Sequence, residues 1–223
     1  MGQLLLVRHG QASWGSEDYD VLSGTGWEQS RLLGASLQAR GIVPDVVVTG
    51  GMRRHRETAE ACLGAMGGFD GEVGTDVGWE EFDHLAMLAA HPAPFEGREP
   101  TKEEFQAWFE EATDRWTAGE HDPEYAESFV AFTARVDAAL RRTAELAGSG
   151  TALVFSSGGP VAWATASLLA GETAVAGTLW RRLNPVCVNS GVTRVVSGRR
   201  GLTLVTFNGH AHLDGVPGAL TYR

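Results

Sequence analysis

Residues 4–11 read Leu-Leu-Leu-Val-Arg-His-Gly-Gln, and this stretch decides the fold. Its first four residues are apolar without polar alternation, which is typical of a strand covered on both faces in an α/β protein. Arg8, His9 and Gly10 follow at the point where the strand ends. Because ligands of open α/β sheets bind beyond the carboxyl ends of the strands, these residues mark one edge of a predicted site.

Further apolar runs extend this pattern along the chain. Strands are expected at residues 45–49, 151–156, 192–196 and 202–207, and the last two are joined by a Gly-Arg-Arg-Gly turn that is typical of a hairpin. Helices are expected at residues 27–40, 53–66, 101–116, 129–147 and 160–169. The alternation predicts a single α/β domain over residues 1–223, with three α/β/α layers and a mostly parallel, doubly wound sheet.

A helical excursion at about residues 84–148 interrupts this alternation. Thr101 and Glu104 form the pattern of a capping box, and an apolar stripe follows at helical spacing. We expect the excursion to pack on the sheet and partly to roof a site. Its large aromatic side chains would serve either substrate recognition or the core, and the core suits most of them better. They are Phe95, Trp108, Phe109 and Trp116.

The composition of the 223 residues is that of a globular protein, with 43% apolar and 21% charged residues. Lys plus Arg number 18 and Asp plus Glu number 28, so the formal net charge is −10. Nucleic acid and an anionic membrane surface are therefore disfavoured as partners, although a few arginines still allow a local anion pocket. The chain begins without a basic leader, and no apolar run reaches the roughly 18 residues that span a bilayer. We expect a cytoplasmic protein.

The two cysteines, Cys62 and Cys187, do not lie in a Cys-x-x-Cys pair. A zinc site is therefore not expected, and two reduced, buried thiols are favoured over a disulfide. His210 and His212 have a chelating spacing, but no further ligand cluster accompanies them. We predict that the protein uses no metal and no cofactor.

The ends of the predicted strands carry groups that suit a phosphate. A Ser-Ser-Gly-Gly turn at residues 156–159 precedes a proline at a helix start, where converging N–H groups and the helix dipole favour an anion. Three arginines, among them Arg54, open the helix after the second strand, and arginine offers paired donors to phosphate oxygens. A histidine such as His9 can attack phosphorus, and a carboxyl group such as Glu80 or Glu81 can protonate the leaving oxygen. Each feature alone is an ordinary turn or a solvated helix face, but together they predict metal-free phosphoryl transfer.

The motifs at these positions resemble those of the histidine phosphatase superfamily, the phosphoglycerate mutase-like proteins. Residues 6–11 are similar to its R-H-G signature, and residues 22–30 resemble its L-T-x-x-G-x-x-Q-A segment. Residues 52–59, Met-Arg-Arg-His-Arg-Glu-Thr-Ala, resemble its L-x-R-A-x-x-T-A segment. Its later segments are matched by Glu127-Ser128, Arg135-Val136, Asn208 and His212-Leu213. The matches span nearly the whole chain in order, and the resemblance implies a phosphoglycerate mutase-like fold.

The resemblance implies roles for the matched residues. His9 would take the phosphoryl group as a phosphohistidine, while Arg8 and Arg54 would hold its oxygens. Glu81 matches the acid of the family's L-x-E segment with Trp79 in place of the leucine, and Glu80 remains an alternative. The substrate would be a small phosphorylated molecule, and no metal is needed. The remaining residues that would bind the phosphate or the substrate are Gly10, Gln11, Ser13 and Gly158.

Two positions depart from the family pattern. Ser157, which we count among the catalytic residues, stands where members commonly carry the second catalytic histidine of an S-H-G-G turn. Exchanging a charged donor for a neutral hydroxyl costs on the order of 1–2 kcal/mol of transition-state stabilisation, roughly tenfold in rate. His55 or His84 would be a substitute imidazole, but a structural or exposed position suits each better, and neither is counted as catalytic. Gly15 stands where many members have a phosphate-binding Asn, and Ser13 would replace that contact.

A phosphomonoesterase is the function that this sequence favours. The alternatives are a phosphoglycerate or phosphosugar mutase with the same chemistry, and a phospho-ligand binder that has lost turnover. A serine hydrolase is disfavoured because Phe155 stands where its nucleophile elbow needs glycine. A dinucleotide-binding role is also disfavoured, because no G-x-G-x-x-G follows the first strand. The oligomeric state is left open, and a homodimer is among the states expected.

Overall fold

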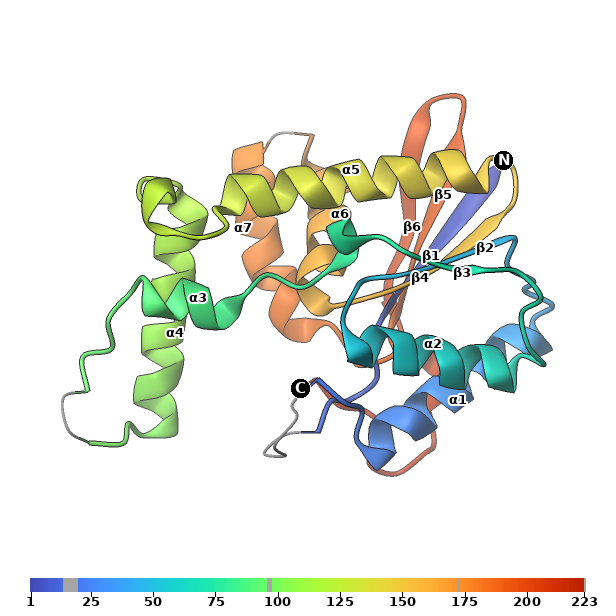
Figure 1. Ribbon diagram of the computed structural model, residues 1–223, viewed down its shortest axis with the longest axis horizontal. Helices are drawn as coiled ribbons and strands as arrows, with labels where there is room; N and C mark the ends of the chain where they lie inside the picture. Colours follow the sequence, from blue (N-terminus) through green and yellow to red (C-terminus); the bar gives the residue numbers. More distant parts are fainter. Residues whose placement is uncertain (14–19, 96–97, 172, 223) are drawn as a thin grey trace. The chain divides into compact units, whose positions relative to one another are not determined.

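A computed structural model describes residues 1–13, 20–95, 98–171 and 173–222 (Figure 1). The chain forms two compact units. The first combines Met1–Glu81 with Val136–Arg223, and the second is Phe82–Arg135. Gly15, which stands where many members of the resembled family have a phosphate-binding Asn, lies outside the described residues.

The first unit is built on a six-stranded sheet with the strand order β3-β2-β4-β1-β5-β6. Its strands are β1 (Gly2–Arg8), β2 (Val46–Thr49), β3 (Val73–Thr75), β4 (Thr151–Ser156), β5 (Val192–Gly198) and β6 (Gly201–Gly209). The first four run parallel, and β5 and β6 pair antiparallel as the predicted hairpin. Arg8 pairs with Ser156 and Thr49 pairs with Phe155, so β1, β2 and β4 end at one edge of the sheet.

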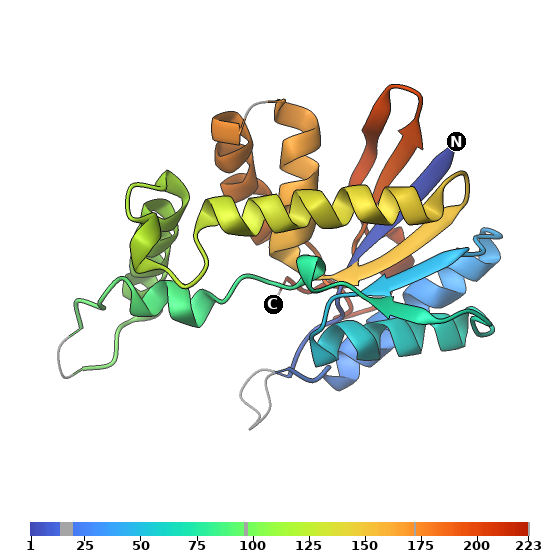
Figure 2. The same ribbon diagram turned by 45° about the horizontal axis from the view of Figure 1, so that its top comes forward.

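Helices cover both faces of this sheet (Figure 2). α1 (Gly24–Ala39) and α2 (Arg53–Ala65) lie on one face. α6 (Gly158–Ala170) and the last part of α5 (Phe129–Ala147) lie on the other, and α7 (Thr173–Leu183) packs against α6. The predicted mostly parallel, three-layer α/β fold is therefore confirmed. Short 3₁₀ turns complete the connections at Val77–Trp79, Asp122–Glu124, Asn184–Val186 and Ala211–Leu213.

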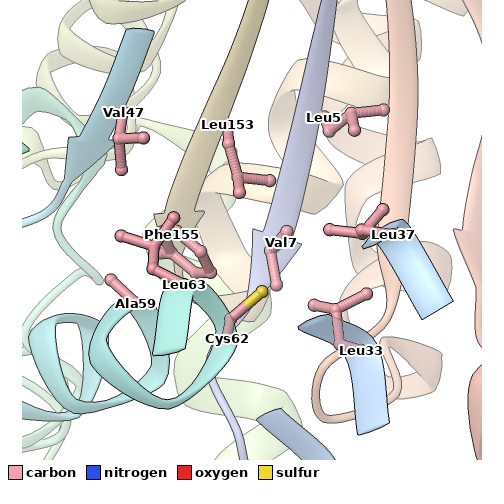
Figure 3. Packing of buried hydrophobic residues seen from close by; sticks show 10 residues of the cluster. All are labelled: Leu5, Val7, Leu33, Leu37, Val47, Ala59, Cys62, Leu63, Leu153 and Phe155. Atoms are coloured by element: carbon pink, nitrogen blue, oxygen red, sulfur yellow. The ribbon is translucent and has the colours of Figure 1, made fainter. Parts of the chain in front are cut away.

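The core between the sheet and its first helical layer is apolar on both sides. Figure 3 shows Leu5 and Val7 of β1 and Phe155 of β4 facing Leu33 of α1 and Cys62 of α2. Neighbouring residues of β1 are also at most 3% exposed, because the second helical layer covers the opposite face. Burial of both faces explains why the strand has no polar alternation.

The second unit contains α3 (His84–Ala89), α4 (Lys102–Ala118) and the first residues of α5. The predicted capping box is present, since Glu104 N–H donates to Thr101 Oγ1 at 3.2 Å and the Glu104 carboxylate accepts from Thr101 N–H at 2.9 Å. The Trp116 ring is 1% exposed and stacks at 4.9 Å from Phe82, which makes it a core residue. That this segment roofs the site stays a prediction.

Cys62 and Cys187 are both buried and free, as predicted, and burial raises the pKa of each thiol to about 12. Within the described ranges, the helices include none whose length and apolar character would let it cross a bilayer.

Candidate active site

His9 follows β1 and is held by backbone and side-chain contacts. Its N–H donates to Ser156 O at 2.8 Å, and its carbonyl accepts from Asn189 Nδ2 at 3.2 Å. The side chain is buried, and Nδ1 lies 2.7 Å from Gly10 O. Because a carbonyl oxygen only accepts, Nδ1 must carry the proton. The lone pair is therefore on Nε2, the nitrogen that is free to act as a nucleophile.

The surroundings of His9 keep its imidazole neutral. Burial lowers the pKa of His9 well below its usual value, and the positive charges of Arg54 and Arg8 lower this pKa further. Desolvation and nearby cations both disfavour a protonated ring. A neutral ring beside two cations combines a nucleophile with a positive field that attracts a phosphate.

Arg54 is positioned by the start of α2. Its side chain is 9% exposed and forms an ion pair with Asp20 at 2.8 Å. Asp20 also accepts from the backbone N–H of Arg53 at 2.8 Å, so this carboxylate caps the helix that carries the arginine. No sequence motif pointed to Asp20, because it is one of several acidic residues that precede α1 and its partner lies far along the chain.

Arg8 points toward the start of α6. Its guanidinium donates to the carbonyls of Cys187 and Tyr222, the latter at 2.9 Å. A Cβ atom on Gly158 would lie 3.5 Å from Arg8 Nε, so this guanidinium lies directly beside the Ser-Gly-Gly turn. The residues predicted after β1 and after β4 are thus adjacent.

Glu81 lies at the same turn. Its carboxylate accepts from Gly159 N–H, in the first turn of α6, at 3.1 Å. Glu80 instead approaches the turn before α2, where a Cβ atom on Gly51 would lie 2.0 Å from its Oε1. Of the two predicted carboxylates, Glu81 is therefore the one beside the Ser-Gly-Gly turn at the start of α6.

The loop after His9 is held by Thr58 and Gln29, for which the sequence motifs predicted no role. Gly10 N–H donates to Thr58 Oγ1 at 3.0 Å, and Gln11 N–H donates to Gln29 Oε1 at 2.8 Å. A Cβ atom on Gly10 would lie 2.4 Å from Gly26 O, which is why glycine is needed there. Both backbone N–H groups already donate to side chains of the protein. The expected contacts of Gly10 and Gln11 with phosphate would therefore need groups other than these N–H donors.

Ser13 is placed by its backbone, whose N–H donates to Val21 O at 2.8 Å. It lies beyond the loop that Thr58 and Gln29 hold. Its contact with phosphate stays a prediction.

The structure adds His55 to this group of residues. Its ring is fully buried, lies 5.8 Å from the ring of His9 between centroids, and places Nε2 at 2.7 Å from Ser157 Oγ. Burial, aided by the charge of Arg54, lowers the pKa of His55 to about 3. His84 begins α3 in the other unit. A structural or exposed position was expected for each histidine, and only the strand order shows that α2 brings His55 to the end of β4.

The C-terminal histidines serve a structural contact. His212 Nε2 lies 2.8 Å from Ser190 Oγ, and Ser190 N–H donates to the carbonyls of Arg8 and His9 at 3.0 and 3.2 Å. In the parts of the chain that the structure covers, no group of three or more His, Cys, Asp or Glu side chains could hold a metal ion. The Asn189-Ser190-Gly191 turn, with Ser190 at φ 58°, was the signal that could have identified this support.

The fold and the site define a three-layer α/β protein with an arginine-flanked histidine at the carboxyl ends of parallel strands. The chain matches the histidine phosphatase superfamily (branch 1) over residues 4–209 and belongs to that family.

Known proteins share parts of the sequence and the fold. A 2,3-bisphosphoglycerate-dependent phosphoglycerate mutase from Parvibaculum lavamentivorans is 34% identical over 76 residues, which cover 31% of this chain and 36% of that mutase. The match thus spans about a third of the curated relative.

Solved structures resemble the whole chain. A mutant phosphoserine phosphatase from Entamoeba histolytica, in complex with phosphoserine, superposes with a TM-score of 0.68 at 19% identity, covering 96% of this chain and 100% of that chain. Phosphoglycerate mutase from Bacillus anthracis gives 0.67 at 20% identity, covering 95% and 94%. A mycobacterial glucosyl-3-phosphoglycerate phosphatase gives 0.63 at 20% identity, covering 94% and 99%. At such identities the likeness concerns the fold.

Proposed function

We propose that the protein hydrolyses a small phosphomonoester through a phosphohistidine on His9, without a metal. His9 Nε2 attacks phosphorus, and the bond between phosphorus and the ester oxygen breaks. Glu81 gives its proton to the leaving oxygen. Arg8 and Arg54 offset the negative charge on the phosphoryl oxygens during the transfer.

The second half of the reaction regenerates the enzyme. Water attacks the phosphorus of the phosphohistidine, the bond between nitrogen and phosphorus breaks, and inorganic phosphate leaves. Glu81, now a carboxylate, takes the proton of the attacking water. Ser157, which we propose replaces the family's second histidine, donates a hydrogen bond to the phosphoryl group from the start of α6.

One observation carries this proposal. The bond between His9 Nδ1 and Gly10 O fixes the neutral ring in the tautomer that leaves Nε2 as the nucleophile, between two arginines. A purely structural role for His9 does not require an unprotonated ring nitrogen to be held beside two cations.

The test is a panel of phosphomonoesters, sugar phosphates and phosphorylated amino acids, assayed for phosphate release by wild type and His9→Ala. Wild type is expected to hydrolyse at least one class, and His9→Ala is expected to lose at least about 10³-fold in kcat because the group that accepts the phosphoryl group is removed. His121→Ala, at an exposed histidine of the Phe82–Arg135 unit, is the matched control and keeps full activity. Equal turnover by His9→Ala and wild type would contradict the proposal.

A mutase is the second candidate, because the curated relative that matches over 76 residues is a phosphoglycerate mutase. In a mutase, a substrate hydroxyl attacks the phosphohistidine in place of water. Transfer between the positions of a phosphoglycerate that outpaces phosphate release would favour this reaction. Binding of phosphate without turnover of any substrate would instead favour the phospho-ligand binder that Ser157 suggested.

A further inference from the structure

His55 lies beside the proposed nucleophile, although the reaction described above does not use it. It is the third residue of α2 and follows Arg54 directly. The helix end that places this arginine therefore also places an imidazole, with its ring 5.8 Å from that of His9. The ring is fully buried, so its polar atoms depend on neighbours in the protein.

The His55 ring contacts the hydroxyl of Ser157. Nε2 and Oγ are 2.7 Å apart, and Ser157 is also fully buried. Ser157 is the N-cap residue of α6, where a serine ordinarily accepts from a backbone N–H of the first turn. Among the described residues its side chain makes no such bond, and Gly159 N–H donates to Glu81 instead. The hydroxyl is thus turned away from its usual partner and toward the imidazole.

The residue types at these two positions support a joint role. The segment that residues 52–59 resemble has alanine where His55 stands, and the S-H-G-G pattern has histidine where Ser157 stands. This chain has an imidazole at position 55 and a hydroxyl at position 157, and the two side chains are in contact. The site therefore keeps an imidazole, which now comes from α2.

On the basis of the proposed phosphoryl transfer, we infer that His55 is a positioning residue that acts through Ser157. A phosphoryl group offers mainly acceptor oxygens, so a chain of hydrogen bonds that ends on it must run in one direction. In this role the ring carries its proton on Nε2, while Nδ1, which has no hydrogen-bond partner among the described residues, keeps the lone pair. His55 Nε2–H then donates to Ser157 Oγ, and Ser157 O–H donates to an oxygen of the phosphoryl group on His9. No covalent bond to His55 forms or breaks in this role.

This arrangement gives the serine hydroxyl a fixed direction. A free hydroxyl rotates about its C–O bond, whereas an oxygen that accepts from a buried ring has its own proton directed elsewhere. A donor that is already aligned contributes more to binding a developing anion than one that must be ordered first.

Binding of inorganic orthovanadate, measured by calorimetry on the full chain, tests this role independently of turnover. His55→Phe keeps a planar ring without a donor, and His55→Gln keeps an N–H donor at similar reach. We expect His55→Phe to raise the Kd about tenfold and His55→Gln to stay within about threefold of wild type. Ser157→Ala is expected to match His55→Phe, and the double variant to be no weaker than either single variant, because the two groups act in series. His121→Phe is the control and binds like wild type.

A purely structural His55 gives a different result. His55→Phe would then bind orthovanadate within twofold of wild type while its free energy of unfolding in urea changes, or His55→Gln would bind as weakly as His55→Phe. Either outcome overturns the inference, as does a wild-type chain that binds no orthovanadate. If wild type binds orthovanadate and His55→Phe does not, but wild type hydrolyses no ester, the proposed function fails and this inference stands.

Discussion

At the scale of single residues, the chemistry of His9 depends on groups from three parts of the chain. Gly10 O fixes its tautomer, Asn189 holds its backbone, and Arg8 and Arg54 lower its pKa. The arginines differ in their anchoring, since Arg8 donates to backbone carbonyls and Arg54 pairs with the carboxylate of Asp20. An anion that enters must compete with Asp20 for Arg54.

Arg54→Lys tests whether the geometry of this cation matters beyond its charge. Lysine keeps the charge but loses the planar fork that fits phosphate oxygens, so kcat/KM is expected to fall by roughly 10- to 100-fold. Arg31→Lys, in an exposed ion pair on α1, serves as the control and keeps wild-type kinetics. Wild-type kcat/KM in Arg54→Lys would show that the fork contributes nothing.

The sequence predicted the site residues that belong to a recognisable motif. It did not predict residues whose role depends on a contact with a distant part of the chain. His9, Arg54 and the Ser-Gly-Gly turn stood at predicted strand ends, so their proximity followed from the topology of parallel sheets. His55 stood inside a helix, where its partner, 102 positions away, could not be read from any spacing. Asp20 was missed for the same reason, because its target lies 34 positions further on.

At the scale of elements, α1 and α2 pack closely because of one glycine. A Cβ atom on Gly34 of α1 would lie 2.1 Å from Cys62 O of α2, so only glycine allows this contact without a shift. α2 carries both Arg54 and His55. The closeness of the two helices therefore affects the site as well as the core.

Gly34→Ala is expected to lower the free energy of unfolding by about 1–3 kcal/mol, because the added methyl group meets backbone. Gly64→Ala is the matched control in α2, where nothing lies within 4 Å of the added Cβ atom. That variant is expected to be as stable as wild type or up to about 1 kcal/mol more stable, since alanine favours helix. Urea unfolding of both variants measures the difference, and equal stability would show that the helices separate freely.

The elements with strong apolar patterns were predicted well and the weak ones were not. β1, β2, β4 and the hairpin were found because buried strands are continuous apolar runs. β3 (Val73–Thr75) is a three-residue edge strand with two exposed residues, so it left no such run. α7 (Thr173–Leu183) was also missed, although Gly171, the left-handed C-cap of α6, marks the break between the two helices.

At the scale of the whole molecule, buried histidines link stability to pH. Burial lowers the pKa of His55 to about 3 and that of His212 to about 4, and it also lowers the pKa of His9. Above the unfolded pKa of about 6.5, both states are neutral and these groups contribute nothing. As the pH falls below that value, the unfolded chain binds protons that the folded chain excludes, so stability is lost.

We therefore expect the free energy of unfolding to fall between pH 7 and pH 5, with His55 accounting for about 2 kcal/mol of the loss. In His55→Phe, the same pH change is expected to cost about 2 kcal/mol less than in wild type. Urea titrations at several pH values measure both slopes. An identical pH dependence in the variant would show that His55 is protonated in the folded protein.

The proposed reaction requires that His9 carries a phosphoryl group during turnover. The most direct measurement is rapid quenching in base during turnover of a hydrolysed phosphomonoester, followed by mass spectrometry of the peptide that contains residue 9. We predict a phosphoryl group on His9 that survives base and is lost in acid, and that is absent from His9→Ala. Steady turnover without phosphorylated His9, or with the phosphoryl group on another residue, would contradict the account.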